Sequence, residues 1–224
     1  MITSSLWQTN AVALRAGEEA MLIDSPIFPD ELEMLPEMLR QSGFEPAGLL
    51  ATHGDWDHLL ARLAFPEASL GVAESTATRI REEPGVAQKE LRDADNRYYV
   101  TRARPLSLGS YQPLPVPGKL ELGAQELELY PAEGHTNDGM ILFARWCGVL
   151  VCGDYVSDVE LPAWTDKALY RATLERLRGL VAEADVVVPG HGAPMTRDTA
   201  IRVLEEDIAY LDEGTVPKGR FTPG

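Results

Sequence analysis

The sequence predicts an α/β fold in which two β-sheets are covered by helices on their outer faces. Strand-like segments followed by helix-like segments occur twice along the chain, an order that favours layered sheets with helices packed against them. The length of 224 residues is enough for one substantial domain with a large core. The content of 45% hydrophobic and 25% charged residues is typical of a globular protein. We therefore expect residues 1–224 to form a single domain.

The chain opens with two strand-like runs, "NAVALRA" and "AMLID", which flank the turn "GEE" and predict a hairpin. A helix is predicted next, because Asp30 and Glu33 resemble a capping box. Four apolar residues then fall on one helical face: Leu32, Leu35, Met38 and Leu39. Pro36 lies inside this pattern and leaves a later helix start open.

The middle of the chain continues with a compact strand, "EPAGLLAT", a charged segment at 51–58 and a short helix in "LLARLAF". A strand in "ASLGVAE" and two helical stretches follow. Four prolines between 105 and 117 then indicate an ordered loop or an edge strand. We expect residues 74–118 to form an insertion that covers the substrate.

The second half predicts paired strands around "GAQ", two more strands around Cys147 and Gly148, and a helix from 166 to 184. A buried strand, "VVVPG", and a last amphipathic helix at 196–212 complete the fold. The odd separation of Cys147 and Cys152 would direct them to opposite faces of one strand. Both are expected to be small buried hydrophobic residues without a disulfide.

Charge and hydropathy count against several classes of partner. The formal charge of -15 disfavours a nucleic acid or an anionic membrane, and no cluster of Lys and Arg offsets it. No apolar run reaches the roughly 18 to 20 residues needed to span a bilayer. The first ten residues lack the features of a signal peptide. We therefore expect a cytoplasmic protein that acts on a small molecule.

The histidines carry the main functional signal. The chain has four, and each follows a predicted strand in a turn that contains glycine: "THGDWDH", "AEGHTND" and "VPGHGAP" hold His53, His58, His135 and His191. A lone histidine is more often structural, but these four share one context. Turns of the same kind hold Asp55, Asp57 and Asp154. Imidazole and carboxylate groups bind first-row divalent metals, and this many donors suit two ions with a shared aspartate and a bridging hydroxide.

The ordered motifs "HGDWDH", "GHT", "CGD" and "PGHG" resemble the metallo-β-lactamase superfamily, especially its glyoxalase-II-like and lactonase-like hydrolases. The resemblance implies a four-layer αβ/βα sandwich with the metals at the edge of two facing sheets. It further implies a first metal at His53, Asp55 and His135, and a second at Asp57, His58 and His191, with Asp154 bridging. Asp24 resembles the family's aspartate that braces the metal loop, although capping of its own turn is an equal alternative.

Asp55 departs from the family pattern His-x-His-x-Asp-His, which has histidine at this position. Three interpretations remain open: a metal ligand, a residue that reaches the metal through water, or the mark of a degenerate site. As a ligand, Asp55 would leave the bimetal site neutral rather than singly positive. Zinc is the first expectation for the two divalent ions. Iron and manganese are alternatives because an oxygen ligand favours harder ions.

The resemblance implies metal-assisted hydrolysis of an ester, thioester or lactone, in which Asp57 orients the hydroxide and relays its proton. An iron-dependent oxidoreductase or dioxygenase, and a non-catalytic metal-binding scaffold, remain as alternatives. β-Lactamase activity is disfavoured because Asp154 stands where many such enzymes have cysteine.

Aromatic and basic residues near the metal turns are the candidates for the substrate pocket: Trp56, Tyr98, Tyr99, Arg102 and Trp164. Thr136 is expected to cap its own turn, with a role in orienting a metal ligand as the alternative. A homodimer is left open.

Overall fold

The computed structural model describes residues 1–222 and contains two six-stranded sheets. The first sheet has the strands in chain order: β1 (Ile2–Thr3), β2 (Asn10–Ala16), β3 (Glu19–Ile23), β4 (Pro46–Leu50), β5 (Ser69–Ala73) and β6 (Tyr111–Leu114). The β1–β2 and β2–β3 pairs are antiparallel, and β3 to β6 are parallel to one another. The predicted hairpin is therefore the β2–β3 pair, and the proline-rich segment ends in an edge strand.

The second sheet reverses the chain order and runs β12 (Met195–Thr196), β11 (Val186–Val188), β10 (Val149–Val151), β9 (Met140–Ala144), β8 (Gln125–Pro131) and β7 (Gly118–Leu122). Only the β10–β11 pair is parallel. Strands β8, β10 and β11 consequently point in one direction, so the turns that follow them lie at the same edge of the sheet.

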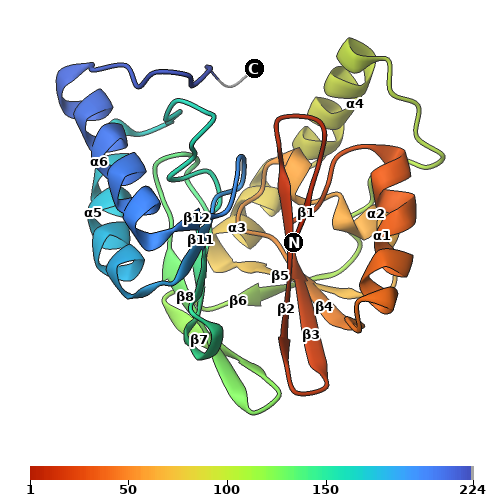
Figure 1. Cartoon of the computed structure of the whole chain (residues 1–224). Helices are drawn as coiled ribbons and strands as arrows, with labels where there is room; N and C mark the ends of the chain where they lie inside the picture. Colours follow the sequence, from red (N-terminus) through yellow and green to blue (C-terminus); the bar gives the residue numbers. More distant parts are fainter. Residues whose placement is uncertain (223–224) are drawn as a thin grey trace.

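Helices cover the outer faces of both sheets (Figure 1). Next to the first sheet lie α1 (Pro29–Gln41), α2 (Ala61–Ala64), α3 (Glu74–Glu82) and α4 (Val86–Tyr98), and next to the second lie α5 (Lys167–Glu183) and α6 (Arg197–Glu213). Two short 3₁₀ turns are also present, η1 (Trp56–His58) and η2 (Arg145–Cys147). No described helix is both long and apolar enough to cross a membrane.

The alternation of side chains along the strands produces the four layers. Along β9, Ile141 and Phe143 join the core under α5 and α6, whereas Met140, Leu142 and Ala144 join the core between the sheets. Because successive strand residues point to opposite faces, one apolar strand serves two cores. These layers confirm the predicted α/β sandwich.

Three local predictions were wrong. The α1 helix begins at Pro29, and its capping box is formed by Glu31, whose Oε2 accepts from the N–H of Phe28, rather than by Asp30 and Glu33. Met38 is exposed instead of sharing the buried face of α1. Cys147 lies in η2 and is exposed, because the chain turns there between β9 and β10; only Cys152 is buried.

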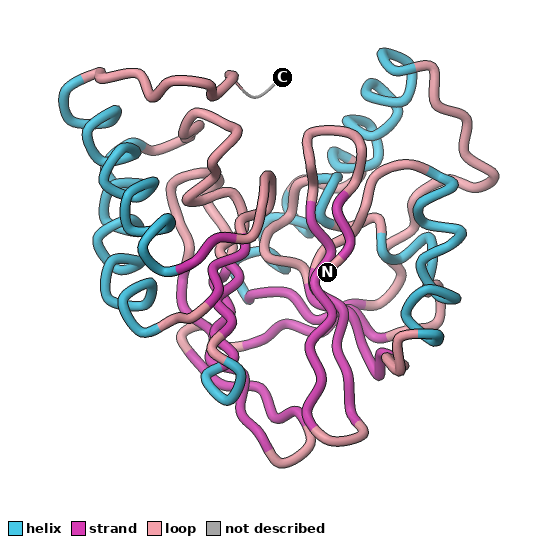
Figure 2. Tube along the Cα trace, viewed as in Figure 1, coloured by secondary structure: helices cyan, strands magenta, loops and turns pink. Residues whose placement is uncertain are grey.

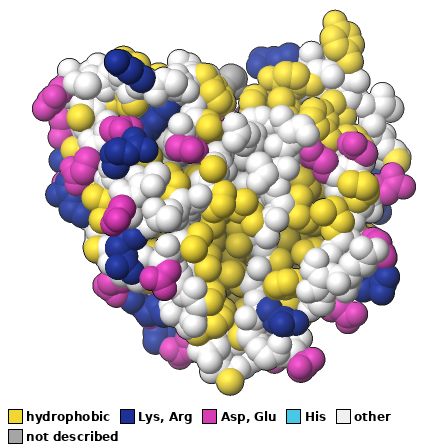
Figure 3. Space-filling view, viewed as in Figure 1, with side chains coloured by type: hydrophobic (Ala, Val, Ile, Leu, Met, Phe, Trp, Pro, Cys, Tyr) yellow, Lys and Arg dark blue, Asp and Glu magenta, His cyan; other side chains and the backbone are white. Residues whose placement is uncertain are grey.

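The loops at one end of the two sheets carry the chemistry (Figure 2). The segment after β4 holds the "HGDWDH" motif, and the turns after β8, β10 and β11 hold His135, Asp154 and His191. On the face shown in Figure 3, basic side chains lie among acidic ones over the outer flanks, and an apolar and neutral band runs between the two halves.

Candidate metal centre

Asp24 fixes the start of the histidine-rich loop. It directly follows β3, its backbone is in the left-handed region with φ at 57°, and its side chain is buried. Its Oδ1 accepts from the N–H of Thr52 at 2.8 Å, and its Oδ2 accepts from Thr52 Oγ1 at 2.9 Å. Oδ2 also lies 3.1 Å from Nδ1 of His58. Asp24 therefore braces the loop as the resemblance implied, and does more than cap its own turn.

Asp138 ties the His53 loop to the turn that holds His135. Its side chain is only 1% exposed. Its Oδ2 accepts from the N–H of Gly54 at 2.9 Å and from Thr76 Oγ1 at 2.7 Å, and Oδ1 accepts from Arg79 at 2.8 Å. These bonds connect the two sheets across the site.

The seven predicted donors converge into three overlapping groups. They are His53, Asp55 and His135; Asp57, His58 and His191; and His53, His58 and Asp154. Within each group the donor atoms lie within 4.8 Å of one another. The carboxylate of Asp154 lies 3.2 to 3.7 Å from the Nε2 atoms of all four histidines. This central place is the one expected of a bridging ligand.

Each histidine is oriented by a partner on its outer nitrogen. Nδ1 of His58 faces Asp24, and Nδ1 of His135 lies 2.9 Å from the carbonyl oxygen of Ala163. Nδ1 of His191 lies 3.1 Å from Thr9 Oγ1, and Nδ1 of His53 lies 3.1 Å from Thr52 Oγ1. Because carboxylate and carbonyl oxygens accept hydrogen bonds, a proton on Nδ1 of His58 and of His135 leaves their Nε2 atoms available to a metal ion.

Unpaired buried atoms test whether a metal fits. Nε2 of His53, Nε2 of His58 and Oδ1 of Asp154 are buried and have no hydrogen-bond partner among the described residues. Buried polar atoms are normally paired, and three such atoms that lie together have the chemistry to bind a cation. A Cβ at position 190 would lie 2.2 Å from Oδ1 of Asp154, which explains why glycine precedes His191. The donor set therefore fits divalent metal ions.

The electrostatics of the cluster also favour cations. Burial opposes a charged imidazole at His135, but Asp154 and Asp55 outweigh it and raise its pKa to about 10. The pKa values of His58 and His191 are likewise raised well above the usual value, against the effect of burial, mainly by Asp154. Carboxylates that hold protons on three imidazoles would hold metal ions in their place.

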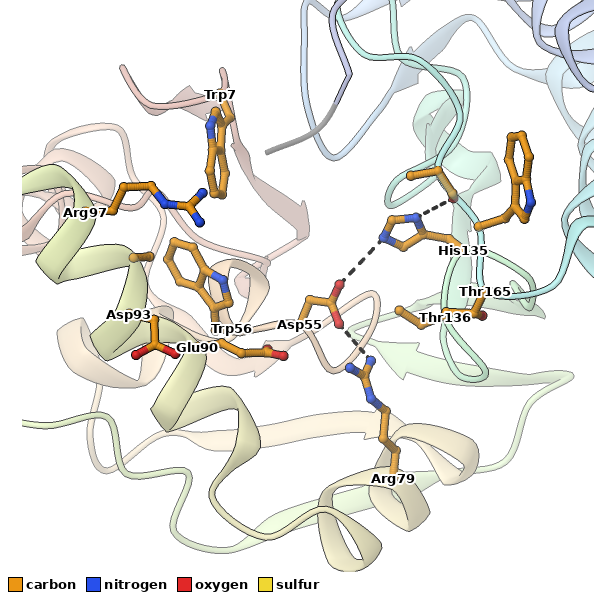
Figure 4. A pocket seen from close by; sticks show the side chains of 13 residues that line it. Trp7, Asp55, Trp56, Arg79, Glu90, Asp93, Arg97, His135, Thr136 and Thr165 are labelled. Atoms are coloured by element: carbon orange, nitrogen blue, oxygen red, sulfur yellow. Dashed lines mark hydrogen bonds and ion pairs between the residues drawn. The ribbon is translucent and has the colours of Figure 1, made fainter. Parts of the chain in front are cut away.

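Asp55 faces both the metal donors and an arginine (Figure 4). Its Oδ2 lies 3.6 Å from Nε2 of His53 and 3.6 Å from Nε2 of His135, whereas its Oδ1 lies 2.8 Å from Nη1 of Arg79. Burial opposes ionisation of Asp55, but the two imidazoles outweigh it and hold its pKa well below the usual value. One oxygen is thus free to meet a metal while Arg79 stabilises the other.

A cleft of about 510 Å³ opens above Asp55 and His135. Trp7 and Trp56 line one side, and Thr165 lines the other (Figure 4). Ala163 and Trp164 also line the cleft. The remaining wall comes from α4. The structure therefore places the predicted Trp56 and Trp164 at the cleft.

Other predicted pocket residues lie elsewhere. Tyr99 is 95% exposed, and Tyr98 and Arg102 do not line the cleft. Arg102 turns inward, where Nε pairs with Asp95 at 2.9 Å and Nη1 donates to the carbonyl of Ile27. Thr136 caps its turn, since Oγ1 donates to the carbonyl of Asp138, and it also lines the cleft.

Sequence reasoning missed Arg79, Asp138 and Trp7. Arg79 lies on a helix with an ordinary exposed-helix pattern, and Asp138 belongs to the "GHTND" turn, where only the histidine attracted notice. Trp7 lies in the β1–β2 loop, and the centroid of its ring lies 5.7 Å from that of the Trp56 ring. Only the motif "GHTND", in which Asp138 stands three residues after the expected ligand His135, offered a signal.

Solved structures share this fold at low sequence identity. A metallo-β-lactamase family protein from Thermus thermophilus matches with a TM-score of 0.68 at 21% identity, over 92% of this chain and 75% of that one. A protein solved in a di-iron-bound form, TTHA1623, matches with a TM-score of 0.66 at 24% identity, over 90% and 96%. BLEG-1, a B3 metallo-β-lactamase, gives 0.63 at 21% identity, over 90% and 95%.

The sequence itself matches a family model. The model described as the metallo-β-lactamase superfamily covers residues 5–191, which include every predicted metal donor from His53 to His191. This range also contains both sheets except for the short strands β1 and β12. The chain therefore belongs to the metallo-β-lactamase superfamily, whose members bind divalent metals and are mostly hydrolases.

Proposed function

We propose that this protein is a binuclear metal-dependent hydrolase that cleaves an ester, thioester or lactone of a small molecule. One observation carries the proposal: six inward-facing donors surround Asp154 beneath an open cleft that Asp55 and His135 line. Two divalent ions bound there would supply a nucleophilic hydroxide at neutral pH and would polarise the carbonyl of the substrate. His53, Asp55 and His135 would hold one ion, and Asp57, His58 and His191 the other, with Asp154 shared.

Asp57 is the proposed catalytic residue. Its Oδ2 lies 3.4 Å from Nε2 of His191 and 3.6 Å from Nε2 of His58, and its side chain is buried at the floor of the site. The carbonyl oxygen of Asp57 accepts from Ser25 Oγ, which fixes the backbone. A carboxylate held in this way can orient the attacking water and carry its proton to the leaving group.

Zinc is the first candidate metal, and iron or manganese the alternative. Asp55 supports the alternative because it adds an oxygen donor to the first group, and oxygen ligands favour harder ions. Arg79 shares the charge of this carboxylate with the metal, so Asp55 would be a weaker donor than an unpaired carboxylate.

An iron-dependent oxidoreductase is the second candidate, and the same carboxylate favours it. Asp55 makes the first group two imidazoles and a carboxylate once His53 and His135 are counted, a donor set found in non-haem iron sites. Hydrolysis remains the leading proposal because the full set provides two ions with a shared carboxylate. The cytoplasmic location stays a prediction.

The test measures the metal content of protein purified without added metal, together with turnover of a panel of esters, thioesters and lactones. We expect about two ions per chain and hydrolysis of at least one substrate class. Asp57→Asn should lower turnover by about 10²- to 10⁴-fold and retain the fold, and its metal content, measured alongside, separates loss of the ion from loss of proton transfer. One iron per chain, oxygen consumption with a thiol and no hydrolysis would favour the oxidoreductase instead. Full activity of Asp57→Asn would remove this residue from catalysis.

A further inference from the structure

One face of α4 forms a wall of the cleft. The lining residues are Glu90, Asp93, Ala94 and Arg97, which follow the i, i+3, i+4, i+7 spacing of a single helical stripe. On another side of α4, Leu91 is buried in the core of the first sheet, with Ala87 packed against that core. The helix is therefore anchored by its apolar side and presents a polar stripe to the cleft.

Two charges of opposite sign on this stripe form no close ion pair, although Arg79 acts to lower the pKa of Glu90 and Arg97 that of Asp93. Asp93 pairs with Lys89 at 2.7 Å. By contrast, Glu90 and Arg97 form no ion pair or side-chain hydrogen bond within residues 1–222. Seven helical residues make almost two full turns, so the two side chains point the same way from positions about 10 Å apart. A cleft with one free anion and one free cation at this spacing is complementary to a ligand with both charges.

The two charged groups lie at different ends of the cleft. Glu90 lies near the metal donors: burial raises its pKa first, and the carboxylate of Asp55 raises it further. Figure 4 shows Glu90 beside Asp55, and Arg97 next to the ring of Trp7. The electrostatic polarity of the α4 wall therefore runs from negative beside Asp55 to positive beside Trp7.

Tryptophan rings lie beside the two charges, and their positions are fixed. The Trp7 and Trp56 rings meet edge to face at 5.7 Å. Trp7 and Gln8 both have φ at 54°, which non-glycine residues rarely adopt. The carbonyl of Trp7 lies 3.3 Å from Nδ1 of His191, and that of Gln8 accepts from the N–H of Gly192 at 3.0 Å. These contacts hold the Trp7 loop against the metal centre, so the aromatic wall is preformed.

We propose that the cleft selects a substrate that carries both a basic and an acidic group, with the basic group against Glu90 and the acidic group against Arg97. The rings of Trp7 and Trp56 cover the apolar part between them. A purely anionic ligand would meet repulsion from Glu90, whereas a purely cationic ligand would leave Arg97 unpaired. That this ligand is a substrate rests on the proposed hydrolase function, whereas recognition of its two charges does not.

The test uses binding rather than turnover, so its outcome is separate from that of the hydrolase proposal. The probes are 6-aminohexanoate, hexylamine, hexanoate and 1-hexanol, four molecules of one chain length that differ only in their charges. Binding to the metal-loaded protein is followed by intrinsic tryptophan fluorescence, since Trp7 and Trp56 line the cleft. We expect 6-aminohexanoate to bind at least about tenfold more tightly than each of the other three.

Variants assign the charges to residues. Glu90→Gln should reduce 6-aminohexanoate binding to about the level of hexanoate, and Arg97→Gln to about the level of hexylamine. Arg92→Gln is the matched control, because it removes a charge from the same helix outside the lining stripe and should leave binding unchanged. Both lining side chains are partly or fully exposed, so the variants should fold, which circular dichroism checks.

Three results would overturn the proposal. Equal binding of the four probes would show that the cleft does not read charge. Hexanoate binding as tightly as 6-aminohexanoate in both the original protein and Arg97→Gln would assign the carboxylate to the metal ions. Unchanged 6-aminohexanoate binding in both Glu90→Gln and Arg97→Gln would exclude the α4 stripe.

Discussion

The two groups of metal donors differ in how firmly the protein holds them. In the group of Asp57, His58 and His191, the side chains are at most 9% exposed. Each imidazole is held by a side chain from the N-terminal part of the chain, His58 by Asp24 and His191 by Thr9. In the other group, Asp55 is 28% and His135 16% exposed, and Asp55 is shared with Arg79. The first arrangement is rigid and enclosed, and the second opens to the cleft. In the proposed two-ion centre, the ion of the second group would therefore lie nearer to a ligand in the cleft than the ion of the first.

Removal of Asp154 should disrupt metal binding by both groups, because this carboxylate lies between them. Asp154→Ala leaves four imidazoles without their common partner, so we expect less than about 0.5 ion per chain and a loss of turnover of about 10³-fold or more. Metal analysis after gel filtration measures the first quantity. Asp198→Ala, an acidic residue in the first turn of α6, is the control and should retain both ions. Two retained ions in Asp154→Ala would contradict the shared-ligand assignment.

Replacement of Asp24 should weaken the enclosed group more than the open one, because Asp24 contacts His58 directly and His53 only through Thr52. Asp24→Asn keeps the size of the side chain but leaves one acceptor oxygen for three donors, Thr52 N, Thr52 Oγ1 and His58 Nδ1. We expect the ion at Asp57, His58 and His191 to bind about 10- to 100-fold more weakly. Competition with a chelator resolves the two affinities. An equal loss at both ions would show that the two groups are not held independently.

Acidification should release metal, and the sign follows from the raised histidine pKa values. In the metal-free centre His135 has a pKa of about 10, so at pH 7 it carries a proton that a metal ion must displace. Apparent affinity should therefore fall by about tenfold per pH unit for each proton displaced, from pH 8.5 to 6.5. Chelator competition at three pH values measures the slope. A pH-independent affinity would show that no proton is displaced from these imidazoles and would contradict the raised pKa of His135.

Asp55→His should have the smallest effect and concerns the open group. It restores the His-x-His-x-Asp-His pattern and replaces an oxygen donor by nitrogen, so we expect the ratio of zinc to iron in purified protein to rise about tenfold or less. Arg79 keeps Asp138 as a partner in this variant. Unchanged metal identity, occupancy and rate would argue against direct ligation by Asp55.

The sequence was sufficient to predict that the seven candidate donors lie together, because each of them follows a strand, and strand ends meet at one edge of a layered sheet. It was not sufficient for their supports. The bonds of Asp138 to Gly54, Thr76 and Arg79 join residues 59 to 84 positions apart, and no local pattern encodes them. The prediction of the pocket-lining residues was partly wrong for a different reason. The phase of α4 directs Glu90 and Arg97 to the cleft, whereas Tyr99 lies just past the helix end and is exposed to solvent.

The contact between Thr9 and His191 has a consequence for folding. These residues lie 182 positions apart, and a backbone bridge as well as a side-chain hydrogen bond joins them. The second set of candidate donors is therefore complete only when these two distant segments meet, and closing so distant a contact is slow. The carbonyl of Trp7 also lies against His191, so the Trp7 loop and the cleft wall that it forms take their places with the same contact.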